Sequence, residues 1–250
     1  MTDSCIFLIK LAVLGLLGGC ATAQRPDPLE PLNRKVFAFN EEVDTLALRP
    51  LATAYEKVVP NLAREGVTNF FSNLADPWSA VNLLLQGRLQ EGFSDVARFG
   101  TNTVVGVLGF HDVASGWGLS RHGKDFGQTL GAWGLEPGAY LVLPLLGPSS
   151  VRDIVALPLD TVGKGQTLVP IGPLRYGMGA LQLVNRRASP LKAGQLIDDI
   201  AFDKYSFLRD AYLQYRRRQI NDMNPSSESS LQDSENPPEA QSLDAASESL

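Results

Sequence analysis

The sequence predicts a mainly α-helical protein with one folded domain, over residues 33–220, and little or no β structure. Through most of that range apolar residues recur at spacings of three and four, which is the pattern of helices with one apolar face. Only the run from Ala139 to Leu143 has the composition of an extended strand. No internal repeat divides the domain, and its length is sufficient for one sizeable core.

The helices are predicted in chain order from their apolar faces and their end signals. The first extends from Leu32 and ends near Arg49-Pro50, because proline disrupts a helix interior. A second follows up to Pro60, and a third covers 62–74. Asp76-Pro77 predicts the start of another helix, with aspartate as N-cap and proline at the first helical position. Further helices are predicted near 89–97, at 173–187 and at 203–219, the last ending in Arg216-Arg217-Arg218, where cations suit the helix dipole.

The N-terminus has the pattern of a bacterial lipoprotein leader. An apolar run ends in Leu17-Gly18-Gly19-Cys20, which predicts a signal peptide over residues 1–19 and covalent N-acyl diacylglycerol on Cys20. A transmembrane helix would need roughly 20 continuous apolar residues. Lys10 and the polar residues after Cys20 interrupt the run. Residues 20–32 are therefore expected to form a lipidated tether. The residue after Cys20 is Ala21 rather than aspartate, and in this respect the sequence resembles lipoproteins that are sorted to the outer membrane.

Charge is unevenly distributed along the chain. The net charge is −5, yet residues 224–250 contain six acidic residues and no lysine or arginine. Because this segment has few large apolar side chains, residues 221–250 are predicted to be a disordered acidic tail. The remainder is nearly neutral, which argues against nucleic-acid binding. Cys5 would leave with the leader and Cys20 would be acylated, so no disulfide is expected within one mature chain.

Two uncharged stretches, Phe99 to Phe110 and Pro137 to Val151, depart from the pattern of a water-soluble domain. Neither is long enough to span a bilayer. Each is either a core segment or apolar surface in one leaflet, and the lipid anchor favours the second interpretation. In the first stretch we hypothesise that aliphatic and aromatic side chains border a lipid path or the bilayer; the candidates are Val104, Val105, Val107, Leu108 and Phe110.

Catalytic and metal-binding patterns are weak. The chain has two histidines, His111 and His122, and no available cysteine, so a zinc site lacks ligands unless carboxylates complete it. His111-Asp112 with Ser115 could suggest a hydrolytic set, but no Gly-x-Ser-x-Gly turn presents the serine. We expect His111 to be a cap or turn residue.

Two further patterns have simpler interpretations. Gly163-Lys164-Gly165 superficially resembles a phosphate-binding loop, but Pro158 stands in place of the first glycine and Gly165 in place of the hydroxyl residue. The carboxylate pairs Glu41-Glu42 and Asp198-Asp199 are expected to be solvated on polar helix faces.

The order of motifs resembles the MlaA/VacJ family of outer-membrane lipoproteins. The opening match is Asp27 to Asn40, which includes Asn33, Arg34, Phe37, Phe39 and Asn40. Other matches are spread along the domain: Phe70 to Asn73, Gln86-Gly87, Arg98-Phe99, Asp112 to Ala114, Asp125 to Gly131, Arg152-Asp153, Asp203, Tyr205, Arg209 and Tyr212. The resemblance covers residues 27–220. One departure is Lys204, where the family often has proline.

This resemblance implies a ring-like helical domain lying in the inner leaflet of the outer membrane, with an amphipathic pore. It also implies removal of phospholipid from the outer leaflet, transfer to a soluble periplasmic carrier, and association with trimeric porins. Neither a metal nor catalysis is implied. Such transfer needs a path that shelters acyl chains from water. Two alternatives remain open: a noncatalytic envelope scaffold associated with porins, and a lipoprotein hydrolase of lipid or cell wall.

Overall fold

The computed structural model describes residues 27–165, 172–189, 191, 198 and 201–221. The predicted signal peptide, Cys20, most of the tether and the acidic tail lie outside them. In chain order the elements are α2 (Glu30–Val43), the π-helix η1 (Asp44–Leu48), α3 (Arg49–Val58), α4 (Asn61–Leu85), α5 (Leu89–Val104), α6 (Val113–Gly116), α7 (Phe126–Ala132), β1 (Tyr140–Leu143), β2 (Gly147–Ser150), α8 (Val151–Gly163), α9 (Pro173–Ala188) and α11 (Lys204–Asn221). The predicted mainly α class is confirmed.

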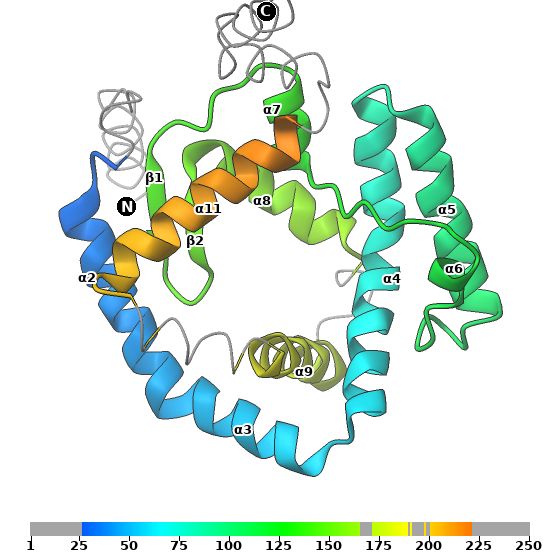
Figure 1. Ribbon diagram of the computed structural model, residues 1–250, viewed down its shortest axis with the longest axis horizontal. Coiled ribbons are helices and arrows are strands. Elements are labelled where there is room, and N and C mark those ends of the chain that lie inside the picture. The colour runs from blue at the N-terminus through cyan, green and yellow to red at the C-terminus, as the bar shows by residue number, and fades with distance from the viewer. Residues whose placement is uncertain (1–26, 166–171, 190, 192–197, 199–200, 222–250) are drawn as a thin grey trace, which may run out of the picture.

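The elements follow one another around a ring (Figure 1). α2, η1 and α3 form one continuous arc, α4 continues it, and α7, α8 and the β-hairpin complete the opposite side. α11 crosses that side and contacts both α7 and β2. α9 packs against α3 and α4, whereas α5 and α6 lie on the other side of α4. Two faces of α4 are therefore covered by different neighbours.

The single long helix α4 corrects the prediction of a new helix at Asp76-Pro77. Pro77 lies inside α4, and Asp76 is buried rather than acting as an N-cap. An interior proline costs a helix about 3 kcal/mol. Contacts of α4 with α5 on one side and α9 on the other outweigh that cost.

The predicted helix end at Arg49-Pro50 is also wrong. The chain passes from α2 through η1 directly into α3, and Pro50 lies in the first turn of α3. Proline has no N–H to donate to the preceding turn, and the N–H of Arg49 just before it bonds five residues back to the Asp44 carbonyl, which is the spacing of a π-helix. The π-helical turn thus joins two helices where the sequence indicates a break.

The strand predicted at 139–143 pairs with a second strand that the sequence did not indicate. β1 and β2 are antiparallel, with Tyr140 opposite Ser150 and Leu143 opposite Gly147. The helices α6, α7 and α8 were likewise not predicted. Two small apolar clusters are buried: Ala52 with Ala188 and Leu191, and Tyr140 with Val142 and Tyr205. No helix in the described residues has the length and apolarity needed to cross a membrane.

Candidate functional site

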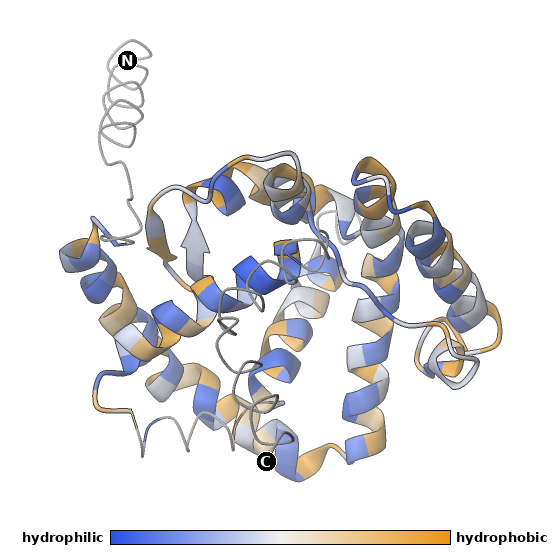
Figure 2. Ribbon diagram, turned by 45° about the horizontal axis from the view of Figure 1, so that its top comes forward, coloured by the Kyte–Doolittle hydropathy of each residue, from blue (hydrophilic) through white to orange (hydrophobic). Residues whose placement is uncertain are grey.

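Large apolar side chains cover much of the exposed surface of the described residues. They occur on most of the helices, and the most exposed include Leu46, Val58, Leu62, Phe93, Val104, Val107, Leu108, Leu146, Val155 and Leu174. Figure 2 shows apolar and polar residues alternating along the helices of the ring. Soluble monomers rarely expose large contiguous apolar patches. A surface of this kind indicates contact with another apolar medium or with a partner.

Helix α5 has a polarity opposite to that of a helix in a soluble protein. Leu89, Phe93 and Val96 are exposed on one face at spacings of four and three. The opposite face buries Asp95, Arg98 and Asn102, along with Gly92. In water the hydrophobic effect favours apolar residues inside and polar residues outside, since burial of each Å² of apolar surface stabilises the fold by roughly 25 cal/mol. This helix is therefore suited to an apolar exterior.

The candidate lipid-path residues lie at the end of α5 and in the loop that follows it. Val104, Val105, Val107, Leu108 and Phe110 are all exposed, with values from 41% for Phe110 to 82% for Val104. They are on the α5 side of α4, away from the centre of the ring (Figure 1). The structure thus brings the five candidates together on the outer side of the molecule.

The loop after α5 has an unusual backbone. Val107 and Leu108 have φ values of 54° and 57°, a left-handed conformation that is strained for non-glycine residues and especially for a β-branched valine. Gly109 continues it with φ 88°, and a Cβ there would lie 2.6 Å from Asn73 Nδ2. Phe110 stacks on Phe70 with ring centroids 5.2 Å apart. α4 therefore fixes the loop in a conformation that leaves its aliphatic side chains exposed.

Beneath this outer surface, Arg98 organises a buried polar network. Its guanidinium donates to both carboxylate oxygens of Asp112, at 2.9 and 3.0 Å, and to Ser115 Oγ at 3.1 Å. Asn102 also donates to Asp112, at 3.0 Å. Burial opposes ionisation of Asp112, but hydrogen bonds from Ser115, Asn102 and Arg98 outweigh it and hold the pKa of this carboxyl well below its usual range.

These contacts do not form a hydrolytic site. Asp112 caps α6, and Ser115 Oγ donates to Asp112 at 2.7 Å, while His111 is exposed beside them. His122 instead pairs with Asp95, at 2.8 Å, and Asp95 accepts from Ser79 at 2.6 Å. In both groups the carboxylate binds the serine directly. A hydrolytic triad requires the histidine between them.

Asp76 belongs to the same buried region. It is 1% exposed and lies 3.3 Å from Arg121 Nε and 3.8 Å from Arg98 Nε. Burial raises the pKa of Asp76 to about 6, and the two arginines only partly offset this. Its Oδ2 atom accepts no hydrogen bond from the described residues.

Two asparagines of the family motif bind the β-hairpin through their side chains. Asn33 Nδ2 donates to the Tyr140 carbonyl and Asn33 Oδ1 accepts from the Val142 amide, each at 3.0 Å. Asn40 repeats the pattern with the Leu143 carbonyl at 2.9 Å and the Leu145 amide at 2.8 Å. Since the two asparagines are seven residues apart, they lie on one face of α2. They hold the backbone of β1 to that helix.

The other motif residues connect α2 with α11. Arg34 donates to both oxygens of Asp203, at 3.2 and 2.6 Å, and lies over the Tyr205 ring at 4.4 Å. Phe37 meets Tyr205 edge-on at 5.6 Å. Phe39, by contrast, is exposed. Arg34 and Phe37 therefore connect α2 to α11 and close the ring there, whereas Phe39 takes no part in this contact.

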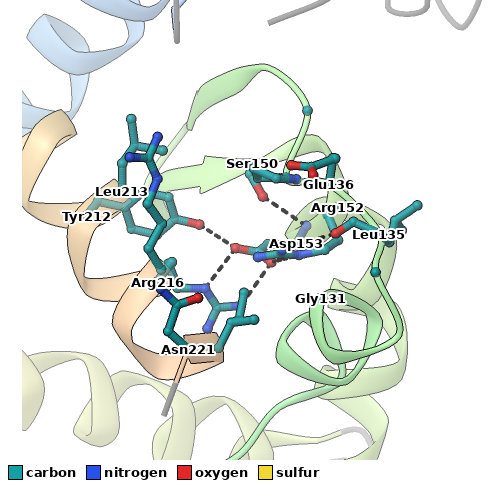
Figure 3. A pocket seen from close by; sticks show the side chains of 15 residues that line it. Gly131, Leu135, Glu136, Ser150, Arg152, Asp153, Tyr212, Leu213, Arg216 and Asn221 are labelled. Atoms are coloured by element: carbon teal, nitrogen blue, oxygen red, sulfur yellow. Dashed lines mark hydrogen bonds and ion pairs between the residues drawn. The ribbon is translucent and has the colours of Figure 1, made fainter. Parts of the chain in front are cut away.

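A cavity with a volume of about 450 Å³ lies between α11, α7 and the start of α8 (Figure 3). Arg216 in its wall binds Asp153 at 2.9 Å and Asp125 at 2.7 Å, and Tyr212 donates to Asp153 at 2.5 Å. Although burial opposes ionisation, the Arg216 guanidinium lowers the pKa of both carboxyls. Leu135 and Ile220 add apolar surface, so this cavity is amphipathic.

This network was not predicted, because Arg216 was interpreted only as a cation near a helix C-terminus. Arg216 is far from Asp125 and Asp153 in the sequence, so no local pattern indicates that they pair.

The prediction that the carboxylate pairs Glu41-Glu42 and Asp198-Asp199 are solvated needs correction for one member of each pair. Glu41 and Asp198 both bind Lys204 rather than remaining solvated. Lys164 follows α8 instead of opening a helix, so it is not in a phosphate-binding loop of the strand-to-helix type.

Comparison with known proteins adds an independent observation. The model of the family described as MlaA lipoprotein matches residues 25–219. The chain is 35% identical over 213 residues to the intermembrane phospholipid transport system lipoprotein MlaA of Escherichia coli, covering 80% of this chain and 82% of that protein. The Haemophilus influenzae protein of the same name is 33% identical, with 82% and 86% covered. A solved structure reported under "Structural basis for maintenance of bacterial outer membrane lipid asymmetry" is similar with a TM-score of 0.70 and 35% identity, over 79% of this chain and 100% of that chain.

Proposed function

Since this chain belongs to the MlaA lipoprotein family, we propose that its ring removes phospholipid from the outer leaflet of the outer membrane and passes it to a soluble periplasmic carrier. The chain is an outer-membrane lipoprotein of intermembrane phospholipid transport, and its role is to maintain the lipid asymmetry of that membrane. It is a transport protein and not an enzyme.

The inverted polarity of the structure is the observation that carries this proposal. Exposed apolar side chains face outward on α5 and neighbouring helices, whereas arginine, aspartate and asparagine side chains are buried behind them. A phospholipid has the same two requirements, since its acyl chains need apolar surroundings and its headgroup needs polar partners. Exposing acyl chains to water would cost about 0.8 kcal/mol per methylene. A sheltered route therefore decides whether transfer occurs.

The proposed arrangement places the outer helices in the inner leaflet of the outer membrane. Val104, Val105, Val107, Leu108 and Phe110 then contact bilayer lipid, because they lie outside the ring rather than toward its centre. The thioether-linked lipid on Cys20, after removal of residues 1–19, anchors the chain to the same leaflet. In this proposal the tether extends from Cys20 to the start of α2, so residues 30–32 of the predicted tether belong to that helix, and the acidic tail follows α11, which ends at Asn221.

Trimeric porins are the proposed membrane partners and a soluble lipid carrier is the proposed periplasmic partner. The exposed apolar face of α5 supports a protein contact within the bilayer as well as a lipid contact. This part of the proposal comes from the family resemblance.

The experiment that tests the function measures lipid directly. Thin-layer chromatography of material bound to the detergent-purified protein is expected to show intact phospholipid. A deletion strain is expected to expose phosphatidylethanolamine to a membrane-impermeant amine reagent, and the wild-type chain should reverse this.

Two outcomes would favour the alternatives. Intact asymmetry in the deletion strain, with damaged porin trimers, would identify a scaffold. Release of free fatty acid or lysophospholipid by the pure protein, lost on Ser115→Ala, would identify a hydrolase.

A further inference from the structure

A second, smaller cavity lies on the inner side of α4. It has a volume of about 180 Å³ and lies between α4, the loop 121–125, Lys164 and α9. Helices α9 and α5 lie on opposite sides of α4, with α9 on the side of the ring's centre (Figure 1). The cavity therefore lies on the inner side of α4, away from the apolar face of α5. We refer to it as the α4–α9 cavity. Its volume is below the roughly 300 Å³ of a typical small-ligand site, so it could hold a headgroup but not a whole lipid.

The charges around the α4–α9 cavity do not balance. Arg121, Lys124, Lys164 and Arg186 line it, against the carboxylates of Asp76 and Asp125. Asp125 is already bound by Arg216, at 2.7 and 3.1 Å. Asp76 is shared between Arg121 and Arg98. The described residues offer no ion-pair partner within 4.0 Å to Lys164 or Arg186, so positive charge is left in excess at the cavity.

Arg121 provides a second indication of a missing anion. Its Nε and Nη2 atoms are buried, yet neither donates a hydrogen bond to any of the described residues. Its carboxylate neighbours are too far or too poorly aligned, at 3.3 Å for Asp76 and 4.0 Å for Asp112. Buried guanidinium donors without an acceptor are costly. An oxygen-rich ligand entering the cavity could satisfy them.

Close packing against α4 fixes the position of Lys164. A Cβ on Gly163 would lie 2.1 Å from a ring carbon of Trp78, and one on Gly165 would lie 3.1 Å from Leu74. Gly165 also has φ +72°, which favours glycine. Trp78 is held in turn by a 2.7 Å hydrogen bond to Asp160. The Gly163-Lys164-Gly165 segment thus lies directly on α4 and brings the lysine to the rim of the cavity.

We propose that the α4–α9 cavity binds the phosphodiester group of a phospholipid in transit, with Arg121, Lys164 and Arg186 around the phosphate oxygens. Guanidinium groups bind phosphate through paired hydrogen bonds, and lysine adds a point charge. Phe71 and Trp78 in the same wall provide apolar surface for the glycerol end. This inference rests on the proposed transport function and assigns it a headgroup site.

The test compares two lipids with the same acyl chains, one with a phosphoglycerol headgroup and one with a free hydroxyl in its place. Full-length lipidated protein in detergent is titrated with fluorescent phosphatidylglycerol and with fluorescent diacylglycerol of the same acyl chains. The variant Lys164→Gln/Arg186→Gln is expected to bind phosphatidylglycerol roughly tenfold more weakly, because two charge-assisted contacts are lost. Its affinity for diacylglycerol should not change. The control Lys57→Gln/Arg218→Gln removes the same charge at exposed positions and should leave both affinities unchanged.

Each other outcome has a separate meaning. Equal weakening for both lipids, or no weakening for either, would overturn the headgroup site while leaving the transport function intact. If the wild-type chain bound neither lipid, the transport function itself would fail. Inorganic phosphate is the third probe, and it should displace phosphatidylglycerol only weakly. Tight phosphate binding that depends on Lys164 and Arg186, with no change in phosphatidylglycerol affinity, would identify a site for free anions and contradict the proposal. Circular dichroism melting must show that the variants fold.

Discussion

Replacing Arg98 with leucine is expected to destabilise the fold strongly. Arg98 is fully buried and donates two hydrogen bonds to Asp112 and one to Ser115. Removing one partner of a buried ion pair costs about 3 to 5 kcal/mol. Asp112 is 22% exposed, so water recovers part of its solvation. We therefore expect the free energy of unfolding at pH 7 to fall by about 3 kcal/mol, the lower end of that range.

The matched variants separate the ion pair from simple loss of packing. Arg98→Leu/Asp112→Asn removes the stranded charge but keeps a side chain that can cap α6, so it should recover at least about 1 kcal/mol of the loss. Arg217→Leu, at an exposed position, should change the free energy of unfolding by less than about 0.5 kcal/mol. Urea unfolding in mild detergent, followed by far-ultraviolet circular dichroism, measures all three.

The pH dependence follows from the lowered pKa of Asp112. A carboxyl whose pKa is lower in the folded than in the unfolded chain stabilises the fold above its unfolded pKa, about 3.9. That contribution disappears as the pH falls through the folded pKa. The difference between wild type and Arg98→Leu should therefore be largest near neutral pH and shrink below about pH 4. The stabilising role of the Arg98–Asp112 ion pair would be refuted by either of two results. One is a decrease of less than about 1 kcal/mol in the free energy of unfolding of Arg98→Leu at pH 7, and the other is no recovery of stability in Arg98→Leu/Asp112→Asn.

Three further predictions concern the anchor, the tail and the outer loop. Cys20→Ser should leave an unprocessed or soluble periplasmic form without function; fractionation of this variant with the outer membrane, together with complementation of a deletion, would contradict the lipid anchor. Truncation after Met223 should leave melting and transfer unchanged, and a loss of transfer with an intact fold would instead show that the acidic tail recruits a partner. A benzophenone side chain at Val105, Val107 or Leu108 should capture phospholipid in living cells; adducts only to the same chain at all three, with capture at a control site elsewhere, would contradict lipid contact at this loop.

The sequence predicted the helices whose apolar residues share one face. α3, α5, α9 and α11 lie within a few residues of their predicted bounds or contain them. For such helices, local periodicity and packing agree. The predicted break at Asp76-Pro77 failed because tertiary contacts on two sides of α4 override the local cost of proline. α8 does begin with a local signal that was overlooked, because Ser150 caps it and Asp153 lies in its first turn, although Pro158 interrupts the pattern inside it. η1 has no side-chain cap to mark it.

The buried ion pairs could not be predicted in the same way. Arg216 and Asp153 are adjacent only in the folded chain, and sequence reasoning assigns charged residues to the surface unless a partner is known. The family resemblance did select Asn33, Asn40 and Arg34, yet their roles as links between α2, the hairpin and α11 required coordinates. Patterns predict the elements of this fold, whereas pairings between distant residues determine how the ring closes.

The two asparagine side chains that bind β1 have a consequence for the medium in which the protein works. Apolar packing between elements is strong only when the alternative is exposure to water, and within hydrocarbon that difference disappears. A hydrogen bond between an amide side chain and a backbone keeps its strength when water is removed. Asn33 and Asn40 therefore form a joint between helix and hairpin that does not depend on the surrounding solvent. A ring held together in this way can have water on one face and lipid on another without loosening at either.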